Sequence, residues 1–233
     1  GAEFLRIKDW TVHHPLDNER IVVDHANITV HAGEIVGLAG LMGAGRTELA
    51  MSVFGHSYGS NISGEVFVKG KAMDLHDVRS AINAGLAYAT EDRKIYGLNL
   101  LQNIRENASM ASLGHLSRHG VMDDNLERKQ VEEYRRNFNI KAPDIDVNVG
   151  KLSGGNQQKV VLAKWVISDP DILILDEPTR GIDVGAKYEI YEIIDRLADQ
   201  GKAILVISSE FFFIFWLCYV IYTVSQGVVT DNV

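Results

Sequence analysis

The sequence predicts an α/β fold with a helical insertion, and three features carry this prediction. An apolar segment at residues 34–39 leads into a glycine-rich turn and then into a helix-forming stretch. Residues 172–175 and 203–207 are continuously apolar, as expected of parallel strands buried on both faces. A charge-rich stretch with helical spacing interrupts these elements. With 46% apolar residues in 233, the chain has enough apolar surface for one large domain or two small ones.

Charge and cysteine content exclude several classes of protein. The chain has 23 Lys and Arg against 31 Asp and Glu, a net charge of −8. No diffuse positive field is therefore present to attract polyanions, and we expect no nucleic-acid partner. Cys218 is the single cysteine, which excludes an internal disulfide and a thiolate metal cluster. A reducing compartment fits this composition best.

The N-terminal half predicts a β subdomain followed by the first part of an α/β core. Residues 1–4 resemble a remnant of tag cleavage and cloning, and we assign no element to them. Short β-branched runs within residues 5–30 predict antiparallel strands. Residues 64–71 predict a hairpin, and residues 78–85 a short helix. We assign residues 5–97 to the β subdomain and to the core part that contains the glycine-rich turn.

Residues 98–150 predict a helical subdomain. The apolar residues of its most charged stretch recur at helical spacing and would form one face: Leu126, Val131, Tyr134 and Phe138. Residues 151–233 then complete the core, with Asp183 placed to cap a helix that ends near Gly201.

One long apolar run lies near the end of the chain. Residues 211–222 are twelve consecutive apolar residues. A membrane-spanning helix needs about 20, and turn residues follow at 225–227, so we predict a buried helix and then a strand hairpin. Two interpretations of its composition stay open: a docking face for a partner or membrane subunit, and a segment altered from its original sequence.

The glycine-rich turn has the spacing of a phosphate-binding loop. Four residues separate Gly40 from Gly45, and Arg46 and Thr47 follow, with arginine where such loops have lysine. Glycines let backbone N–H groups point at phosphate oxygens, and the following helix directs its positive end at them. A tight turn without a ligand is the alternative. The predicted nucleotide-binding residues are Gly40, Leu41, Met42, Gly43, Ala44, Gly45, Arg46, Thr47 and Glu48.

Two further motifs strengthen the phosphate-site interpretation. Asp176 and Glu177 end an apolar strand, where an aspartate can position magnesium and a glutamate can polarise water. Two acids that merely face solvent are the alternative. Between these motifs, Ser153, Gly154 and Gly155 open a helix and are suited to holding a phosphate. The alternative there is a serine that only caps the helix.

In their order and spacing, these motifs resemble the nucleotide-binding domain of ATP-binding cassette (ABC) transporters. The resemblance covers residues 5–207 and implies a P-loop NTPase fold with a RecA-like core, an antiparallel β subdomain and a helical subdomain. Residues 40–48, 91–94 and 178–187 more narrowly resemble the second, C-terminal cassette of bacterial sugar-import ATPases of the ribose, xylose and galactose types. Those ATPases carry two cassettes in one polypeptide.

The resemblance also implies cofactors, partners and a location. ATP and Mg²⁺ would be the cofactors. A second cassette and membrane permease subunits would be direct partners, and a periplasmic sugar-binding protein an indirect one. The chain would lie peripherally at the cytoplasmic face of the inner membrane.

The family's roles transfer position by position. Thr47, Asp176 and Glu91 take the places of metal-binding residues. Glu177 takes that of the catalytic glutamate, Glu91 that of the glutamine-loop residue and Ser209 that of the switch histidine. For Glu91 we expect the metal or Arg93 as partner, with a plain surface glutamate as the alternative.

Other positions match the adenine contact and the dimer-interface motifs. The ring-bearing candidates for stacking on adenine are His13 and His14, of which we select His14. A solvated loop histidine is the alternative. The signature residues, which would act on the ATP of the other cassette, are Ser153, Gly154, Gly155 and Gln157, and Asp183 matches the D-loop aspartate.

Three departures from the family pattern predict asymmetry between the two ATP sites. Arg46 keeps the positive charge of the usual lysine but is bulkier and forked. Glu91 adds a carboxylate, and Ser209 lacks the imidazole of a switch histidine. The chain would therefore contribute an altered loop to a weak site and an intact signature to a competent one.

The leading hypothesis is a cassette that binds ATP and hydrolyses it weakly to drive import of a simple sugar. One alternative is a regulatory half-site that holds ATP with little hydrolysis. The other is a non-transport member of the same superfamily, acting in translation or repair.

Overall fold

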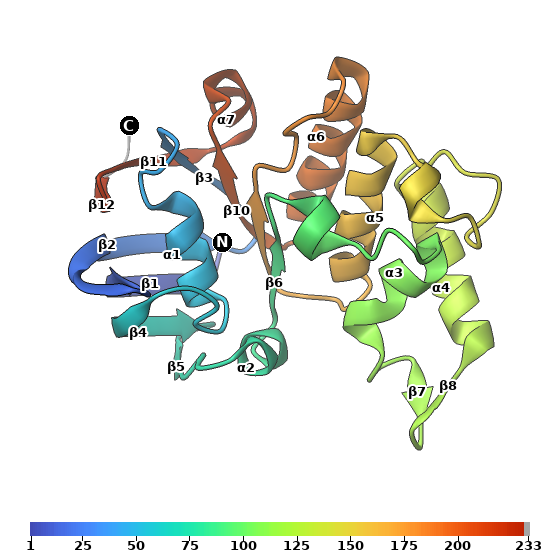
Figure 1. Ribbon diagram of the computed structural model, residues 1–233, viewed down its shortest axis with the longest axis horizontal. Helices are drawn as coiled ribbons and strands as arrows, with labels where there is room; N and C mark the ends of the chain where they lie inside the picture. The colour runs from blue at the N-terminus through green and yellow to red at the C-terminus, as the bar shows by residue number, and fades with distance from the viewer. Residues whose placement is uncertain (231–233) are drawn as a thin grey trace. The chain divides into compact units, whose positions relative to one another are not determined.

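The computed structural model describes residues 1–230, so the last three residues of the predicted 151–233 segment lie outside the described residues (Figure 1). The chain forms two compact units. The first comprises Gly1–Tyr88, Pro170–Pro178 and the chain from Ile194 onward. The second comprises Ala89–Asp169 and Thr179–Ile193.

A ten-stranded mixed sheet forms the first unit. Its strands are β1 (Glu3–His14), β2 (Asp17–His31), β3 (Ile35–Gly40), β4 (Ser60–Val68), β5 (Lys71–Met73), β6 (Leu86–Ala89), β9 (Ile172–Asp176), β10 (Ala203–Ser208), β11 (Val220–Ser225) and β12 (Val228–Thr230). They lie in the order β5-β4-β1-β2-β12-β11-β3-β10-β9-β6. This order joins an antiparallel half to a largely parallel half.

The antiparallel half matches the predicted β subdomain. β1 pairs with β2 on one side and with β4 on the other, and β4 and β5 form the expected hairpin, with its turn at Lys69 and Gly70. β1 begins at Glu3, and the carbonyls of Ala2 and Phe4 accept hydrogen bonds from Ala32 and Lys69. Residues 1–4, to which we assigned no element, therefore contribute to the sheet.

The parallel half holds the core. β10 lies between β3 and β9 and is parallel to both, and β11 runs parallel to β3 on its other side. Every residue of β9 and β10 is buried. Such burial on both faces is why these strands have continuous apolar runs rather than alternating ones. Both predicted core strands are confirmed.

Three helices belong wholly to the first unit. α1 (Arg46–Val53) follows β3 and contacts β1, β2 and β3 (Figure 1). α2 (Val78–Asn83) begins with a capping box in which Asp77 and Ser80 bond each other's backbone N–H groups. α7 (Phe211–Leu217) contacts β3 and β10.

The apolar run near the chain end forms a helix followed by a hairpin, as predicted. β11 and β12 pair antiparallel after α7. Burial is only partial, because Phe213, Ile214 and Leu217 are buried whereas four aromatic residues of the helix are exposed. Those four are Phe211, Phe212, Phe215 and Trp216. Within residues 1–230, every helix is too short or too polar to cross a membrane.

The second unit is mainly helical. It contains α3 (Ile104–Ser109), α4 (Asp124–Asn137), α5 (Gly154–Val166) and the first part of α6 (Val184–Asp199). Short elements connect them: η1 (Arg93–Gly97), η2 (Met110–Ser112), η3 (Val149–Lys151) and the hairpin of β7 (Ser117–Arg118) and β8 (Val121–Met122). α3, α4 and α5 pack against one another (Figure 1).

Buried charges join these helices. Glu127 on α4 is 3% exposed and accepts hydrogen bonds from Arg105 at 2.5 Å and from Ser109 at 2.6 Å. Lys159 on α5 is 1% exposed, donates to the carbonyl of Asn139 at 2.9 Å and pairs with Glu189 on α6. Each buried charge has an opposite charge and further hydrogen bonds, as burial requires.

We expect the Ile204→Ala variant to unfold more readily, because Ile204 lies in the central strand β10 with no exposed surface. The cavity should lower the free energy of unfolding by about 2–5 kcal/mol in urea denaturation. Ile95→Ala is the matched control, since Ile95 is 69% exposed. Its free energy of unfolding should stay within about 0.5 kcal/mol of the parent value. Equal losses in the two variants would contradict the assigned core.

Candidate functional site

The glycine-rich loop lies at the C-terminal end of β3. Gly45 caps the N-terminus of α1 with φ 102, a left-handed conformation that favours glycine. A Cβ at Gly45 would lie 2.5 Å from the carbonyl oxygen of Val22, and one at Gly40 would lie 2.5 Å from that of Val224. Glycine is therefore needed at both ends of the loop for steric reasons. Leu41 and Met42, between them, are exposed at 77% and 74%.

Asp176 lies deep beside this loop, at the C-terminal end of β9. It has no exposed surface and accepts hydrogen bonds from the hydroxyl of Tyr88, at 2.9 Å, and from the side chain of Thr47. Burial raises the pKa of Asp176 to about 6. Its Oδ1 atom has no hydrogen-bond partner within the described part of the chain.

This unpartnered oxygen fits a bound cation. A divalent cation would satisfy Asp176 Oδ1 and remove the penalty of burying the carboxylate. Residues 1–230 contain no group of three or more His, Cys, Asp or Glu side chains able to hold a metal ion. The hydroxyl of Thr47 and the carboxylate of Asp176 are oxygen donors of the kind that could hold Mg²⁺, which commonly takes one or two protein ligands and completes its shell with phosphate and water.

Glu177 follows Asp176 and is also buried. Its Oε1 atom accepts the backbone N–H of Ser209 at 2.8 Å and lies 3.4 Å from Arg46 Nη2. Its Oε2 atom accepts the hydroxyl of Ser208 at 3.4 Å. The structure therefore brings three predicted residues together: Arg46, Glu177 and Ser209. Ser209 interacts with Glu177 through its backbone N–H. A different side chain at position 209 would leave this hydrogen bond in place.

A cavity of about 390 Å³ lies beside the loop. His14, Tyr58, Gly43, Gly45 and Glu48 contribute to its lining. The rings of His14 and Tyr58 meet edge to face, with centroids 6.4 Å apart. The predicted base-stacking residue thus lies next to the predicted phosphate loop.

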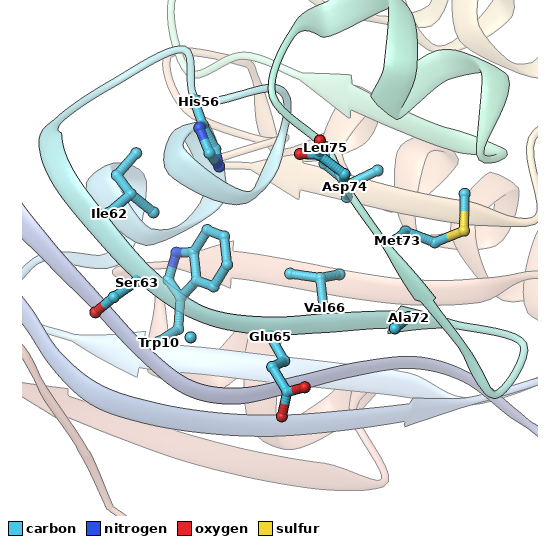
Figure 2. Close-up of a pocket in the computed structure, with 11 residues that line it drawn as sticks. Trp10, His56, Ile62, Ser63, Glu65, Val66, Ala72, Met73, Asp74 and Leu75 are labelled. Carbon is cyan, nitrogen blue, oxygen red and sulfur yellow. The ribbon is translucent and has the colours of Figure 1, made fainter.

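Another cavity, of about 430 Å³, lies against β4 and β5 and contains none of the predicted site residues (Figure 2). Trp10 and Val66 lie in its wall near His56. Trp10 is 4% exposed and donates its indole N–H to Ser52 at 2.9 Å. Size alone therefore does not locate the site, and we place it at the smaller cavity because the loop residues line that one.

The remaining predicted residues belong to the second unit. Glu91 pairs with Arg180, and Arg93 instead bonds to the carbonyl of Arg180 at 3.1 Å and to Gln157 Oε1 at 3.5 Å. The expectation of Arg93 as the partner of Glu91 is therefore wrong. A Cβ at Gly154 would lie 2.7 Å from Arg93 Nη2, so this guanidinium packs against the backbone at the start of α5.

The signature residues begin α5, next to the start of α6. Ser153 caps α5 and accepts hydrogen bonds from Asn156, at 2.9 Å from the side-chain amide and 3.5 Å from the backbone N–H. Asp183 caps α6 through the N–H of Ala186 at 2.9 Å. A Cβ at Gly155 would lie 2.4 Å from that of Ala186. The signature and the D-loop aspartate are thus packed together, and Ser153 has the capping role that the alternative interpretation describes.

Sequence reasoning missed Tyr88 and Tyr58. Tyr88 lies on β6, and its role depends on β6 being the neighbour of β9 in the sheet. Tyr58 follows α1, whereas we expected the aromatic residue in the segment before the loop. An aromatic residue three positions after Gly55, which follows the helix, was the available signal for Tyr58.

A buried lysine joins α5 to η1 in the second unit. Lys164 is 7% exposed and donates to the carbonyl of Gly97 at 2.7 Å. Burial lowers the pKa of Lys164 from 10.5 to about 8, because the charged form loses hydration. Between these two pH values the unfolded chain binds more protons than the folded one, so stability from this group rises with pH.

We therefore expect the stability difference between the parent protein and Lys164→Met to depend on pH. From about pH 7 to about pH 10, the parent should gain about 2 kcal/mol in unfolding free energy relative to the variant. Urea denaturation of both proteins at the two pH values measures this difference, and titrations common to both cancel. A difference independent of pH would show that Lys164 is not buried as described.

A family model and several known proteins are similar to this chain in sequence. A family model described as ABC transporter matches residues 23–180. The L-arabinose transport ATP-binding protein AraG of Geobacillus stearothermophilus is 57% identical over all of this chain and 45% of its own length. The xylose import ATP-binding protein XylG of Geobacillus kaustophilus is 46% identical over all of this chain and 46% of its own length. The chain thus spans about half the length of these curated relatives.

Among solved structures, a dimeric ATP-binding cassette in a post-hydrolysis state, bound to ADP and Pi, has a TM-score of 0.83. The alignment covers 98% of this chain and 97% of that chain, at 19% identity. Similarity at this level of identity establishes the fold, and it confirms the predicted α/β cassette architecture.

Proposed function

The chain belongs to the ABC transporter family, and from this premise we propose that it binds ATP with Mg²⁺ and hydrolyses it slowly to drive sugar import. The observation that carries the proposal is the meeting of the loop, Asp176 and Glu177 at adjacent strand ends. Backbone N–H groups of residues 40–47 and the positive end of α1 would bind the phosphates. Glu177 would polarise the attacking water.

Thr47 and Asp176 would hold the Mg²⁺. When bound, the cation neutralises phosphate charge and orients the phosphates. The unpartnered Oδ1 of Asp176 supports this role. The same proposal includes Glu91 as a further metal-binding residue. It also includes Ser209 as the residue at the position of the switch histidine. His14 and Tyr58 would contact the base.

The relatives support proposals for the sugar, the partners and the location. AraG and XylG are named for L-arabinose and xylose, so we favour a pentose as the transported sugar. Because the chain spans less than half of each relative, a second cassette in the same polypeptide would supply the rest of the ATPase. We place it, as the C-terminal cassette, beside permease subunits at the cytoplasmic face of the membrane, with a periplasmic sugar-binding protein as an indirect partner.

A regulatory half-site with little hydrolysis is the second candidate function. The contact between Arg46 and Glu177 favours it, because in the nucleotide-free chain Arg46 occupies the carboxylate that would polarise the attacking water. The non-transport alternative has no such support, since the relatives above are named for sugar transport and import.

Replacing Gly45 by valine should abolish ATP binding. The new side chain would clash with the Val22 carbonyl and would strain a backbone with φ 102. Gly70→Val is the matched control, because Gly70 has φ 75 in the β4–β5 turn and a Cβ there meets nothing within 4 Å. Calorimetric titration with Mg·ATP should show binding by the control and none by Gly45→Val. Unchanged affinity in Gly45→Val would overturn the site.

Hydrolysis by this chain should be slow and should depend on Glu177. The double change Arg46→Lys with Ser209→His should raise turnover at least about tenfold. It introduces the lysine usual in such loops and an imidazole that can contact the γ-phosphate, and one charge-stabilising contact of this kind is worth about a hundredfold or more. The histidine would keep the backbone bond from position 209 to Glu177. Steady-state phosphate release, with Glu177→Gln as the inactive control, measures this. A parent chain as fast as the double variant would contradict the weak-site hypothesis.

Replacing Ser153 by arginine should leave ATP binding by this chain intact and should suppress hydrolysis by a full two-cassette protein. The signature would act on ATP held by the other cassette, so the local loop is not involved. Loss of the Ser153 cap of α5 should lower the free energy of unfolding by about 1 kcal/mol. Thermal unfolding measures this loss of stability separately from the effect on hydrolysis. Equal loss of binding in the isolated chain would show that Ser153 belongs to the local site.

A further inference from the structure

Neither carboxylate oxygen of Glu177 is free in this structure. Oε1 has the N–H of Ser209 at 2.8 Å and Arg46 Nη2 at 3.4 Å, and Oε2 has the hydroxyl of Ser208 at 3.4 Å. The side chains of Arg46 and Glu177 are each 7% exposed. The backbone of Glu177 has φ 46, a left-handed conformation that is strained for a non-glycine residue. Surrounding contacts must therefore hold this residue in place.

Arg46 is only half satisfied by this arrangement. Nη2 faces Glu177, but Nη1 is buried and has no hydrogen-bond partner within residues 1–230. A buried N–H without an acceptor is costly, and a guanidinium binds oxyanions through two parallel N–H groups. Arg46 also lies in the first turn of α1, directly after the loop that we assign to phosphate. Its empty donor is therefore available to an incoming anion.

The two partners of Arg46 compete. A bidentate grip on a phosphate uses one N–H of each terminal nitrogen and aligns the guanidinium plane with the phosphate, which draws Nη2 away from Glu177. The terminal phosphates of ATP carry more negative charge than one carboxylate, which favours the exchange. Once Arg46 leaves, Glu177 keeps the bonds from Ser208 and Ser209, and Oε1 is open to a further hydrogen bond.

We propose that Arg46 is a positioning residue with two alternative partners: it pairs with Glu177 in the nucleotide-free chain and releases it when it binds phosphate. Glu177 then becomes available only when the loop is occupied. This inference rests on the proposed ATP site. It gives Arg46 a role that lysine would fulfil less well, because an ammonium group lacks the two parallel N–H donors of a guanidinium.

A double-mutant cycle on nucleotide binding tests the exchange. The parent chain, Arg46→Met, Glu177→Gln and the double variant are titrated calorimetrically with Mg²⁺ and a non-hydrolysable ATP analogue. Glu177→Gln should tighten binding about fivefold in the parent, because the nucleotide no longer breaks an ion pair, and less than about twofold in Arg46→Met. Glu48→Gln is the matched control, since it removes a carboxylate beside the loop and should act equally in both backgrounds.

Thermal unfolding without nucleotide is the second readout. Each single replacement should lower Tm, and the double variant should lose less than the sum, since neither charge is then left buried alone. If Arg46→Met does not fold, Arg46→Lys takes its place, and the effect of Glu177→Gln should still shrink.

Each contrary outcome has a distinct meaning. If the two replacements have additive effects on nucleotide affinity, the proposed exchange is wrong, even if their effects on Tm are not additive. The ion pair between Arg46 and Glu177 would then be present both with and without nucleotide. Additive effects on both binding and Tm overturn the ion pair itself. Absence of binding by all variants and the parent would refute the proposed ATP site, and the inference with it.

Discussion

The adjacency of three parallel strand ends is the constraint on which the site depends. β10 lies between β3 and β9. The loop after β3, Ser208 and Ser209 at the end of β10, and Asp176 and Glu177 at the end of β9 therefore meet at one edge of the sheet. Ligands of parallel α/β sheets bind at such carboxyl ends. Without this strand order, the glycine-rich loop would be an ordinary turn and the two acids an unexplained buried pair.

Burial gives these polar groups their chemical character. Asp176 has a raised pKa and an unpartnered oxygen, and Arg46 has an unpartnered nitrogen, although both residues are almost fully buried. Folded proteins rarely leave such atoms unsatisfied, and those that remain commonly belong to functional sites. A cation at Asp176 and an anion at Arg46 would satisfy both atoms, which is why the two observations point to one metal-bound phosphate ligand.

The sequence predicts the parts of this molecule that local patterns determine. Apolar runs locate β9 and β10, glycine spacing locates the loop, and Asp183 locates the start of α6. The sequence does not predict contacts between residues that are distant along the chain. The pairing of Glu91 with Arg180 and the bond from Tyr88 to Asp176 depend on tertiary neighbours, and the exposure of Phe212 depends on which face of α7 meets the sheet.

The most direct test of the central claim is a crystal structure of this chain with Mg²⁺ and a non-hydrolysable ATP analogue. The account predicts phosphate oxygens about 3 Å from the backbone nitrogens of residues 43–47, and the cation between Thr47 and Asp176. A nucleotide bound elsewhere, with this loop free of phosphate, would contradict the claim that the three strand ends form the ATP site.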